Sequence, residues 1–236
     1  MTTTAYDQHF IASDIAFTDD KDQVHLDIPF RKVKRIGNIV FGMAGCLECM
    51  YDFSNMICEY LTGTVTELGI PETIVKREDR DFIVMVYTNG MCVKLTKRKH
   101  SGEIAEENVT NTSTVIGSGS QYVQGVIKDC PSAVVAVLEA IKHDKYTDGD
   151  VKYTSVRRDD VHNLEAHPMS NTLKMQITGL ETELKAANEF LNADENQGKV
   201  FKASTEVYHV GTTDSLPKGT MMKLLKESLD QMRAQA

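Results

Sequence analysis

The sequence lacks a long apolar run, an excess of basic residues and a basic leader. Without about eighteen consecutive apolar residues, we expect no membrane-spanning helix. Without a basic start followed by an apolar stretch, we expect no signal peptide and therefore a cytoplasmic protein. The formal net charge of −8 argues against nucleic acid and anionic membrane surfaces as partners.

The sequence also lacks a disulfide framework and a recognisable metal motif. It has 5 cysteines, an odd number, which argues against disulfide pairing throughout. Cys46 and Cys49 form a C-x-x-C pattern, but further ligands at matching spacing are missing. Buried structural thiols are favoured over metal or redox use. The histidines are scattered, without H-E-x-x-H, so we expect no metal and no cofactor.

What the chain does contain is an alternation of strand and helix patterns. The patterns predict a hairpin over 2–14, an apolar strand within 32–44, a helix over 46–62, a hairpin around Asn89-Gly90, a strand and helix over 113–129, a helix over 131–143 and a strand over 150–156. Gly63 stops the first helix, and Asn89-Gly90 asks for a type I′ turn. Helices in pairs between antiparallel strands favour an α+β fold.

The character of the chain changes after about residue 158. A polar linker is followed by leucines at helical spacing over 173–191, a possible short strand within 199–210 and a last helix over 217–236. We therefore expect a core over 1–157 and a mostly helical C-terminal extension over 158–236. We expect residues 170–236 to form two helices and a short strand pair that pack outside the core.

The chain opens on Met1 followed by three threonines. If Met1 is removed, Thr2 carries both a hydroxyl and an α-amino group, whose ordinary pKa of about 7.7–8.0 suits a general base. Threonine with its own terminal amine is a recognised nucleophile and base pair. Because side chains alternate along a strand, we expect Thr3 to point to the opposite face from Thr2.

Such a nucleophile needs a cation, an acid that orients the cation, and N–H groups for the oxyanion. The candidates are Asp14 at the end of the return strand, Lys32, Gly45 between strand and helix, Ser118 in "IGSGS", and Asp144 and Thr147 in "HDKYTDG". With Gln8 as the middle of the hairpin, we expect Asp14 opposite Thr2. Each candidate taken singly also fits a solvated strand end, a wet basic face or a helix-entry turn.

Together these segments resemble the proteasome β-subunit and bacterial HslV peptidase family of N-terminal nucleophile hydrolases. "TT", "SDIAFT", "RKVKRI", "GMAG", "IGSGSQYVQGVI" and "HDKYTDG" follow the family's order over roughly residues 2–157. The resemblance implies a four-layer αββα sandwich. It implies a threonine peptidase that needs no cofactor and acts on peptides or unfolded proteins. It also implies assembly as a homo-oligomeric ring, with an unfoldase as a possible protein partner.

The resemblance also assigns roles to particular residues. Thr2 matches the nucleophile, Asp14 and Lys32 the acid and cation, Gly45 the oxyanion glycine, and Ser118, Asp144 and Thr147 the group that supports the terminal amine. Thr18 matches the residue that holds the substrate backbone. Met43 and Leu47 match the walls of the first specificity pocket, which implies cleavage after apolar residues.

Several departures leave other interpretations open. The first hairpin is four residues shorter than is usual in the family, and threonine replaces the more frequent serine at Thr147. Cys46, Leu47 and Glu48 replace small residues, and Glu48 could repel or select substrates. The alternative is a catalytically inactive, proteasome-like scaffold or interaction protein that retains Met1. An amidase of the same fold acting on small amides is a third option.

Overall fold

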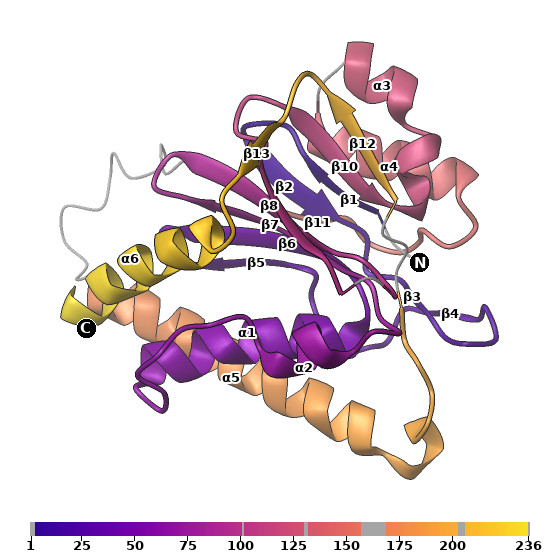
Figure 1. Cartoon of the computed structure of the whole chain (residues 1–236). Coiled ribbons are helices and arrows are strands. Elements are labelled where there is room, and N and C mark those ends of the chain that lie inside the picture. The colour runs from indigo at the N-terminus through magenta and orange to yellow at the C-terminus, as the bar shows by residue number, and fades with distance from the viewer. Residues whose placement is uncertain (1–2, 101, 130–131, 157–168, 203–205, 236) are drawn as a thin grey trace.

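Two antiparallel sheets lie face to face at the centre of the molecule (Figure 1). The computed structural model describes residues 3–100, 102–129, 132–156, 169–202 and 206–235. One sheet has the strand order β11-β2-β1-β10-β12, and the other has the order β13-β9-β8-β7-β6-β5.

The strands are short and come from all along the chain. The first sheet contains β1 (Thr3–Tyr6), β2 (Phe10–Ser13), β10 (Ser113–Gly117), β11 (Lys152–Ser155) and β12 (Val207–Val210). The second contains β5 (Val33–Ile36), β6 (Ile39–Gly45), β7 (Phe82–Thr88), β8 (Met91–Lys97), β9 (Ile104–Asn108) and β13 (Asp214–Leu216). A small pair, β3 (Phe17–Thr18) and β4 (Val24–His25), lies outside both sheets.

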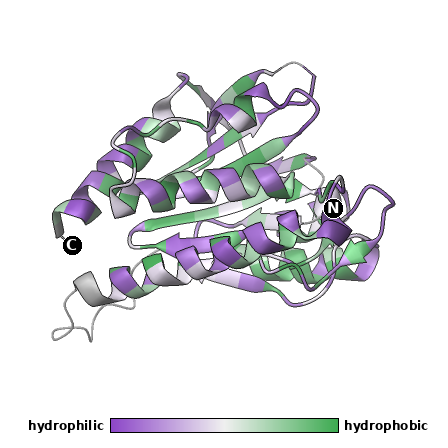
Figure 2. Ribbon diagram, turned by 90° about the horizontal axis from the view of Figure 1, so that it is seen from below, coloured by the Kyte–Doolittle hydropathy of each residue, from purple (hydrophilic) through white to green (hydrophobic). Residues whose placement is uncertain are grey.

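Helices cover the outer face of each sheet. The first sheet carries the 3₁₀ turn η1 (Ser118–Gln121), α3 (Gln124–Asp129) and α4 (Ala133–His143). The second carries α1 (Leu47–Thr62), α2 (Glu72–Lys76), α5 (Met169–Asn192) and α6 (Thr220–Gln235), with a 3₁₀ turn at Asp194–Asn196 after α5. Figure 2 views this layer from below and shows hydrophilic and hydrophobic residues mixed along its helices. Within the described residues, no helix is long and apolar enough to cross a membrane.

Three apolar clusters fill the spaces between the four layers. One lies between the sheets and includes Tyr6, Ile11, Val40 and Ile83. The second joins the first sheet to α3 and α4, and the third joins the second sheet to α1, α5 and α6. Burial of apolar faces on both sides of each sheet is what holds such a stack together. The fold is therefore the expected α+β, four-layer αββα sandwich.

Several local predictions are confirmed. The first hairpin forms from β1 and β2, and the second from β7 and β8. Asn89 and Gly90 have φ of 51° and 78°, as a type I′ turn requires. Gly63 ends α1 with φ 79°, a left-handed C-cap.

Two predictions about strands are wrong. The single strand expected within 32–44 is a hairpin of β5 and β6, because Gly37 adopts φ 57° and reverses the chain. The C-terminal strands do not pair with each other: β12 pairs with β10, and β13 pairs with β9. Each adds an edge to one sheet, which local sequence patterns cannot indicate. The expected boundary at 157/158 lies outside the described residues.

Candidate active site

The site is built around the start of β1, where the register of the first hairpin matters. Thr4 pairs with Ser13, and the Asp14 N–H donates to the Thr3 carbonyl at 3.3 Å, so Asp14 lies opposite Thr3. The expectation that Asp14 lies opposite Thr2 is wrong by one residue. The Asp7 N–H donates to the Phe10 carbonyl at 3.2 Å, so two residues form the loop and its centre falls after Gln8. Thr2 itself lies outside the described residues.

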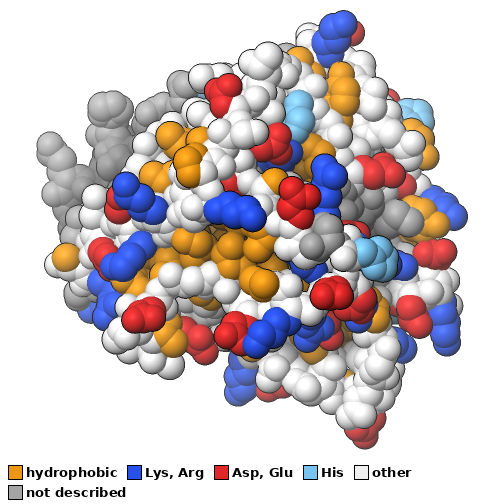
Figure 3. Space-filling model, viewed as in Figure 1, with side chains coloured by type: hydrophobic (Ala, Val, Ile, Leu, Met, Phe, Trp, Pro, Cys, Tyr) orange, Lys and Arg blue, Asp and Glu red, His pale blue; other side chains and the backbone are white. Residues whose placement is uncertain are grey.

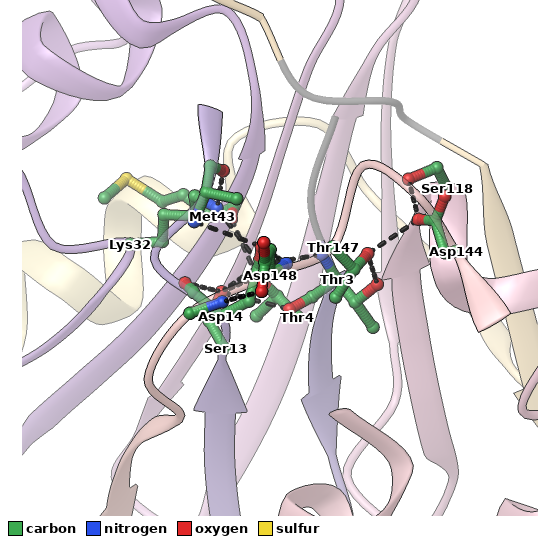
Figure 4. A network of polar contacts seen from close by, with 12 residues as sticks. Thr3, Thr4, Ser13, Asp14, Lys32, Met43, Ser118, Asp144, Thr147 and Asp148 are labelled. Carbon is green, nitrogen blue, oxygen red and sulfur yellow. Dashed lines mark hydrogen bonds and ion pairs between the residues drawn. The ribbon is translucent and has the colours of Figure 1, made fainter. Parts of the chain in front are cut away.

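Asp14 and Lys32 form a buried ion pair beside Thr3 (Figure 4). Lys32 Nζ lies 3.1 Å from the Asp14 carboxylate, and both side chains are fully buried. The same carboxylate accepts the Thr3 N–H at 2.9 Å, the Ala16 N–H at 3.2 Å and the Asp148 N–H at 3.4 Å. Asp14 therefore fixes both the cation and the main chain directly after Thr2.

Lys32 is a buried lysine whose pKa lies close to the physiological range. Burial lowers the pKa of Lys32 to about 8, and the attraction of Asp14 opposes this lowering. The ammonium also donates to the Ala16 carbonyl and lies 4.6 Å from the centre of the Phe17 ring. Its pKa still exceeds 7, so a positive charge dominates at neutral pH, where it favours a nearby oxyanion.

A second polar chain reaches β1 from the other side. The hydroxyls of Thr3 and Thr147 lie 2.7 Å apart, and Thr147 donates to the Asp144 carboxylate at 2.6 Å. The Ser118 hydroxyl donates to the same Asp144 oxygen. The structure thus brings together all three residues expected to support the terminal amine (Figure 4).

Thr3 is the residue that sequence reasoning missed. Its hydroxyl contacts Thr147 and its N–H donates to Asp14, so it joins the two polar groups. Gly119 permits this arrangement, because a Cβ there would lie 2.1 Å from the Thr3 hydroxyl oxygen. The expectation that Thr3 faces away from Thr2 concerns a residue outside the described ranges and stays a prediction. The two-residue loop after Asp7 sets the register that places Thr3 opposite Asp14. Its residues, Gln8 and His9, are not a sequence signature of a two-residue turn, so no signal in the sequence indicated this register.

Gly45 ends β6 immediately before α1, at a position that only glycine fits. Its φ is 118°, and a Cβ there would lie 2.4 Å from the Asp81 carbonyl oxygen. The end of β6 that carries Gly45 is hydrogen-bonded to the site, because the Met43 N–H donates to the Lys32 carbonyl at 3.0 Å. The Met43 carbonyl accepts the Thr4 hydroxyl at 2.9 Å.

The three residues expected to bind substrate have buried side chains or are already paired within the chain. Met43 and Leu47 are fully buried in the cluster under the second sheet. Thr18 pairs through its main chain with Lys202, from the C-terminal part of the chain. Glu48, considered above as a charge that repels or selects substrates, forms ion pairs with Arg77 and Arg80.

The remaining expectations concern thiols and metals. Cys46, Cys49, Cys58 and Cys92 are buried and form no disulfide, as expected of structural thiols, and Cys130 lies outside the described residues. In the part of the chain that the structure describes, no group of three or more His, Cys, Asp or Glu side chains is arranged to hold a metal ion.

No protein-family model matches the sequence, and no curated protein matches it. Among solved structures, the chain is similar to eukaryotic HslV from Trypanosoma brucei, with TM-score 0.43 and 14% identity over 65% of this chain and 97% of that one. It is also similar to Anbu from Hyphomicrobium sp. strain MC1, with TM-score 0.45 and 12% identity over 84% of this chain and 100% of that one. A Gly-1 mutant of that Anbu gives TM-score 0.47 and 10% identity over 78% and 97%. At these values the likeness carries no argument about what this chain does.

Proposed function

We propose that this chain is a threonine-type peptidase whose nucleophile is Thr2 after removal of Met1. The observation that carries the proposal is the fully buried Asp14–Lys32 pair that holds the main chain of Thr3. Burial of an ion pair is costly, and in some proteins such a pair is retained because it fixes a geometry. Thr3 is the covalent neighbour of Thr2, so the pair holds the main chain directly after the proposed nucleophile.

In the proposed mechanism the Thr2 amine takes the proton of the Thr2 hydroxyl, which attacks the peptide carbonyl. The charge of Lys32 stabilises the developing alkoxide, and Asp14 keeps Lys32 protonated. Ser118, Asp144 and Thr147 orient the amine through the hydrogen-bonded chain that ends on Thr3. The Gly45 N–H stabilises the tetrahedral oxyanion, a role worth ~3–4 kcal/mol in comparable sites.

The substrate in this proposal is an extended peptide or unfolded protein. In this proposal Thr18, once released from Lys202, holds the main chain of the substrate. Met43 and Leu47, which are fully buried in this structure, become the walls of a pocket for an apolar residue before the cut. Assembly as a homo-oligomeric ring, with an unfoldase as a further partner, belongs to the same proposal. Hydrophobic side chains gather between charged ones on the face seen in Figure 3, as at many interaction surfaces.

The test is hydrolysis of fluorogenic peptides with an apolar residue before the cut. Thr2→Ala is expected to abolish hydrolysis, whereas Thr64→Ala, an exposed threonine on a loop, leaves it unchanged. The intact mass of the purified protein shows whether Met1 has been removed. Hydrolysis by a protein that keeps Met1, or by Thr2→Ala, would rule out Thr2 as the nucleophile.

The second candidate is a non-catalytic scaffold that keeps Met1. One observation favours it: the main chain of Thr18 is already paired with Lys202 of the same chain. Retained Met1 together with no hydrolysis under any condition would support the scaffold. Native mass spectrometry separates assembly from activity, because a 26 kDa monomer at micromolar concentration would contradict the ring in either case.

A further inference from the structure

The main chain beside the candidate site is paired with a later segment of the same chain. The Thr18 N–H donates to the Lys202 carbonyl at 3.2 Å, and the Lys202 N–H donates to the Thr18 carbonyl at 2.9 Å. Lys202 also forms an antiparallel bridge with Cys46, and the Leu47 N–H donates to the Phe201 carbonyl at 2.9 Å. Residues 201–202 therefore lie as an extended strand between β3 and the start of α1.

This strand is anchored rather than loosely apposed. The Phe201 side chain is 2% exposed and contacts two rings, His25 at 5.3 Å and Phe190 at 5.1 Å between centroids. The anchor thus joins β4, α5 and the strand. Lys202 has an exposed side chain, and its main chain makes both hydrogen bonds to Thr18.

Glu206, the first described residue after this strand, also contacts the sheet next to Thr3. On the far side of residues 203–205, the Glu206 carbonyl accepts the Gly117 N–H at 2.8 Å, and Gly117 lies opposite Thr3 in the sheet. In Figure 1 the described segment after α5 reaches β3, and β12 lies beside β10. Lys202 and Glu206 therefore contact two different strands, β3 and β10, and β10 carries the partner of Thr3.

We propose that residues 201–202 are an autoinhibitory strand, which occupies in cis the main-chain groups of Thr18 and Leu47 that an extended peptide would pair with. This inference rests on the proposed function only in taking a peptide as the competing ligand. Main-chain pairing on both edges is how peptides add to strands, and it recognises them largely without regard to sequence. A tethered strand has an effective concentration of the order of millimolar, so a free peptide competes poorly until the strand is released.

The test compares two substitutions at one position. Lys202→Pro removes the N–H that donates to Thr18, whereas Lys202→Ala keeps it and serves as the matched control. The probe is a fluorescein-labelled peptide of residues 199–206, KVFKASTE, whose binding is followed by fluorescence anisotropy. We expect Lys202→Pro to bind it at least about tenfold more tightly than the wild type, because the competing strand is weakened. Lys202→Ala is expected to bind as the wild type does.

A second variant keeps the proposal falsifiable if Lys202→Pro does not fold. Phe201→Gly removes the ring that anchors the strand and is expected to tighten probe binding in the same direction. Equal binding by the wild type and by every folded variant of Phe201 or Lys202 would overturn the proposal. Tighter binding without any hydrolysis would uphold the inhibitory strand and reject the peptidase, whereas hydrolysis with unchanged binding would do the reverse.

Discussion

Lys32 and Lys34 are two residues apart, and their side chains are buried in similar surroundings. Lys32 contacts the N-terminal hairpin, whereas Lys34 contacts helix α5. Burial lowers the pKa of each to about 8. Each donates to a backbone carbonyl and lies over a phenylalanine ring, Phe17 at 4.6 Å for Lys32 and Phe30 at 3.7 Å for Lys34. Each pairs with a carboxylate, Asp14 for Lys32 and Glu183 for Lys34.

The difference lies in what else each carboxylate holds. Asp14 comes from the N-terminal hairpin and also binds the main chain of Thr3, inside a network of hydroxyls. Glu183 comes from α5 and also accepts the Arg31 N–H at 2.6 Å, next to a groove lined by Ile15, Leu26 and Leu180. A buried lysine with a lowered pKa is therefore no sign of catalysis by itself. The neighbouring hydroxyls and Gly45 make Lys32 the candidate, whereas Lys34 ties the C-terminal region to β5.

The largest effect is expected from deleting residues 158–236, which removes Glu183 and leaves Asp14. We expect this variant to unfold, since α5 and α6 bury several apolar side chains: Leu173, Leu180, Leu184, Ala187, Met221, Leu225, Leu229 and Met232. Burial of each large one is worth about 1.5–3 kcal/mol, against a typical total stability of 5–15 kcal/mol. Circular dichroism with a thermal melt checks this. A cooperative melt of the truncated chain would instead support a self-sufficient core that ends at residue 157.

Replacing each lysine in turn shows whether the loss of hydrolysis depends on where the lysine lies or only on the removal of a buried charge. Lys32→Met is expected to reduce peptide hydrolysis by about 10²–10³-fold, as loss of an oxyanion-stabilising group does. Lys34→Met is expected to leave hydrolysis almost unchanged, although it removes a lysine with the same pKa. Both assays are run below the lower of the two melting temperatures. Equal loss in the two variants would show that Lys32 acts through stability alone.

Removing the carboxylates compares the two pairs as structural elements. Asp14→Ala is expected to destabilise the fold by about 3–5 kcal/mol, because it leaves a fully buried lysine without its counter-charge. Glu183→Ala is expected to cost less, since the Glu183 side chain is 19% exposed and water can solvate Lys34 in its absence. Urea denaturation measures both. The double variant Lys34→Met/Glu183→Leu should recover most of the loss, because a buried pair is replaced by apolar groups.

These comparisons also show what could be predicted from the sequence. The hairpin turn at Asn89-Gly90, the helix ended by Gly63 and the sandwich class follow from local patterns or from the resemblance. The grouping of Ser118, Asp144 and Thr147 came from the resemblance and from no local pattern. The register of the first hairpin depended on a loop of two residues rather than three, and a one-residue slip changes which side chain meets Asp14.

The C-terminal part could not be predicted in the same way. Its helices follow from periodic leucines, but the partners of β12 and β13 are strands about a hundred residues away in the chain. The pairing of Lys202 with Thr18 is set by two main-chain hydrogen bonds, which leave no trace in residue type. Likewise, nothing near Lys34 in the sequence indicates Glu183 as its partner.

The pH dependence of stability sharpens the comparison further. The pKa of each lysine is about 8 in the folded chain and 10.5 as the ordinary value. Between these values the unfolded chain binds more protons, so the free energy of unfolding rises with pH from about 8 to 10.5 and is insensitive to these groups below 8. Each lysine contributes at most about 1.4 kcal/mol per pH unit. Lys34→Met should remove about half of this rise in urea denaturation curves; an unchanged slope would show that the two lysines are not equivalent.

The smallest effect is expected at the two rings, which also contact each other with centroids 6.5 Å apart. Phe30→Leu and Phe17→Leu each remove an aromatic face that favours the ammonium form, so the pKa of the neighbouring lysine should fall further. The lost cation–π attraction is about 2 kcal/mol for each, because both ammonium groups are buried, and is larger at Phe30, whose ring lies closer to its ammonium. NMR titration of the lysine ¹³Cε resonances follows the two pKa values separately. If Phe17→Leu moved Lys34 as much as Lys32, the shared Phe17–Phe30 contact would couple the two sites, and Lys34 would no longer serve as an independent control for the candidate active site.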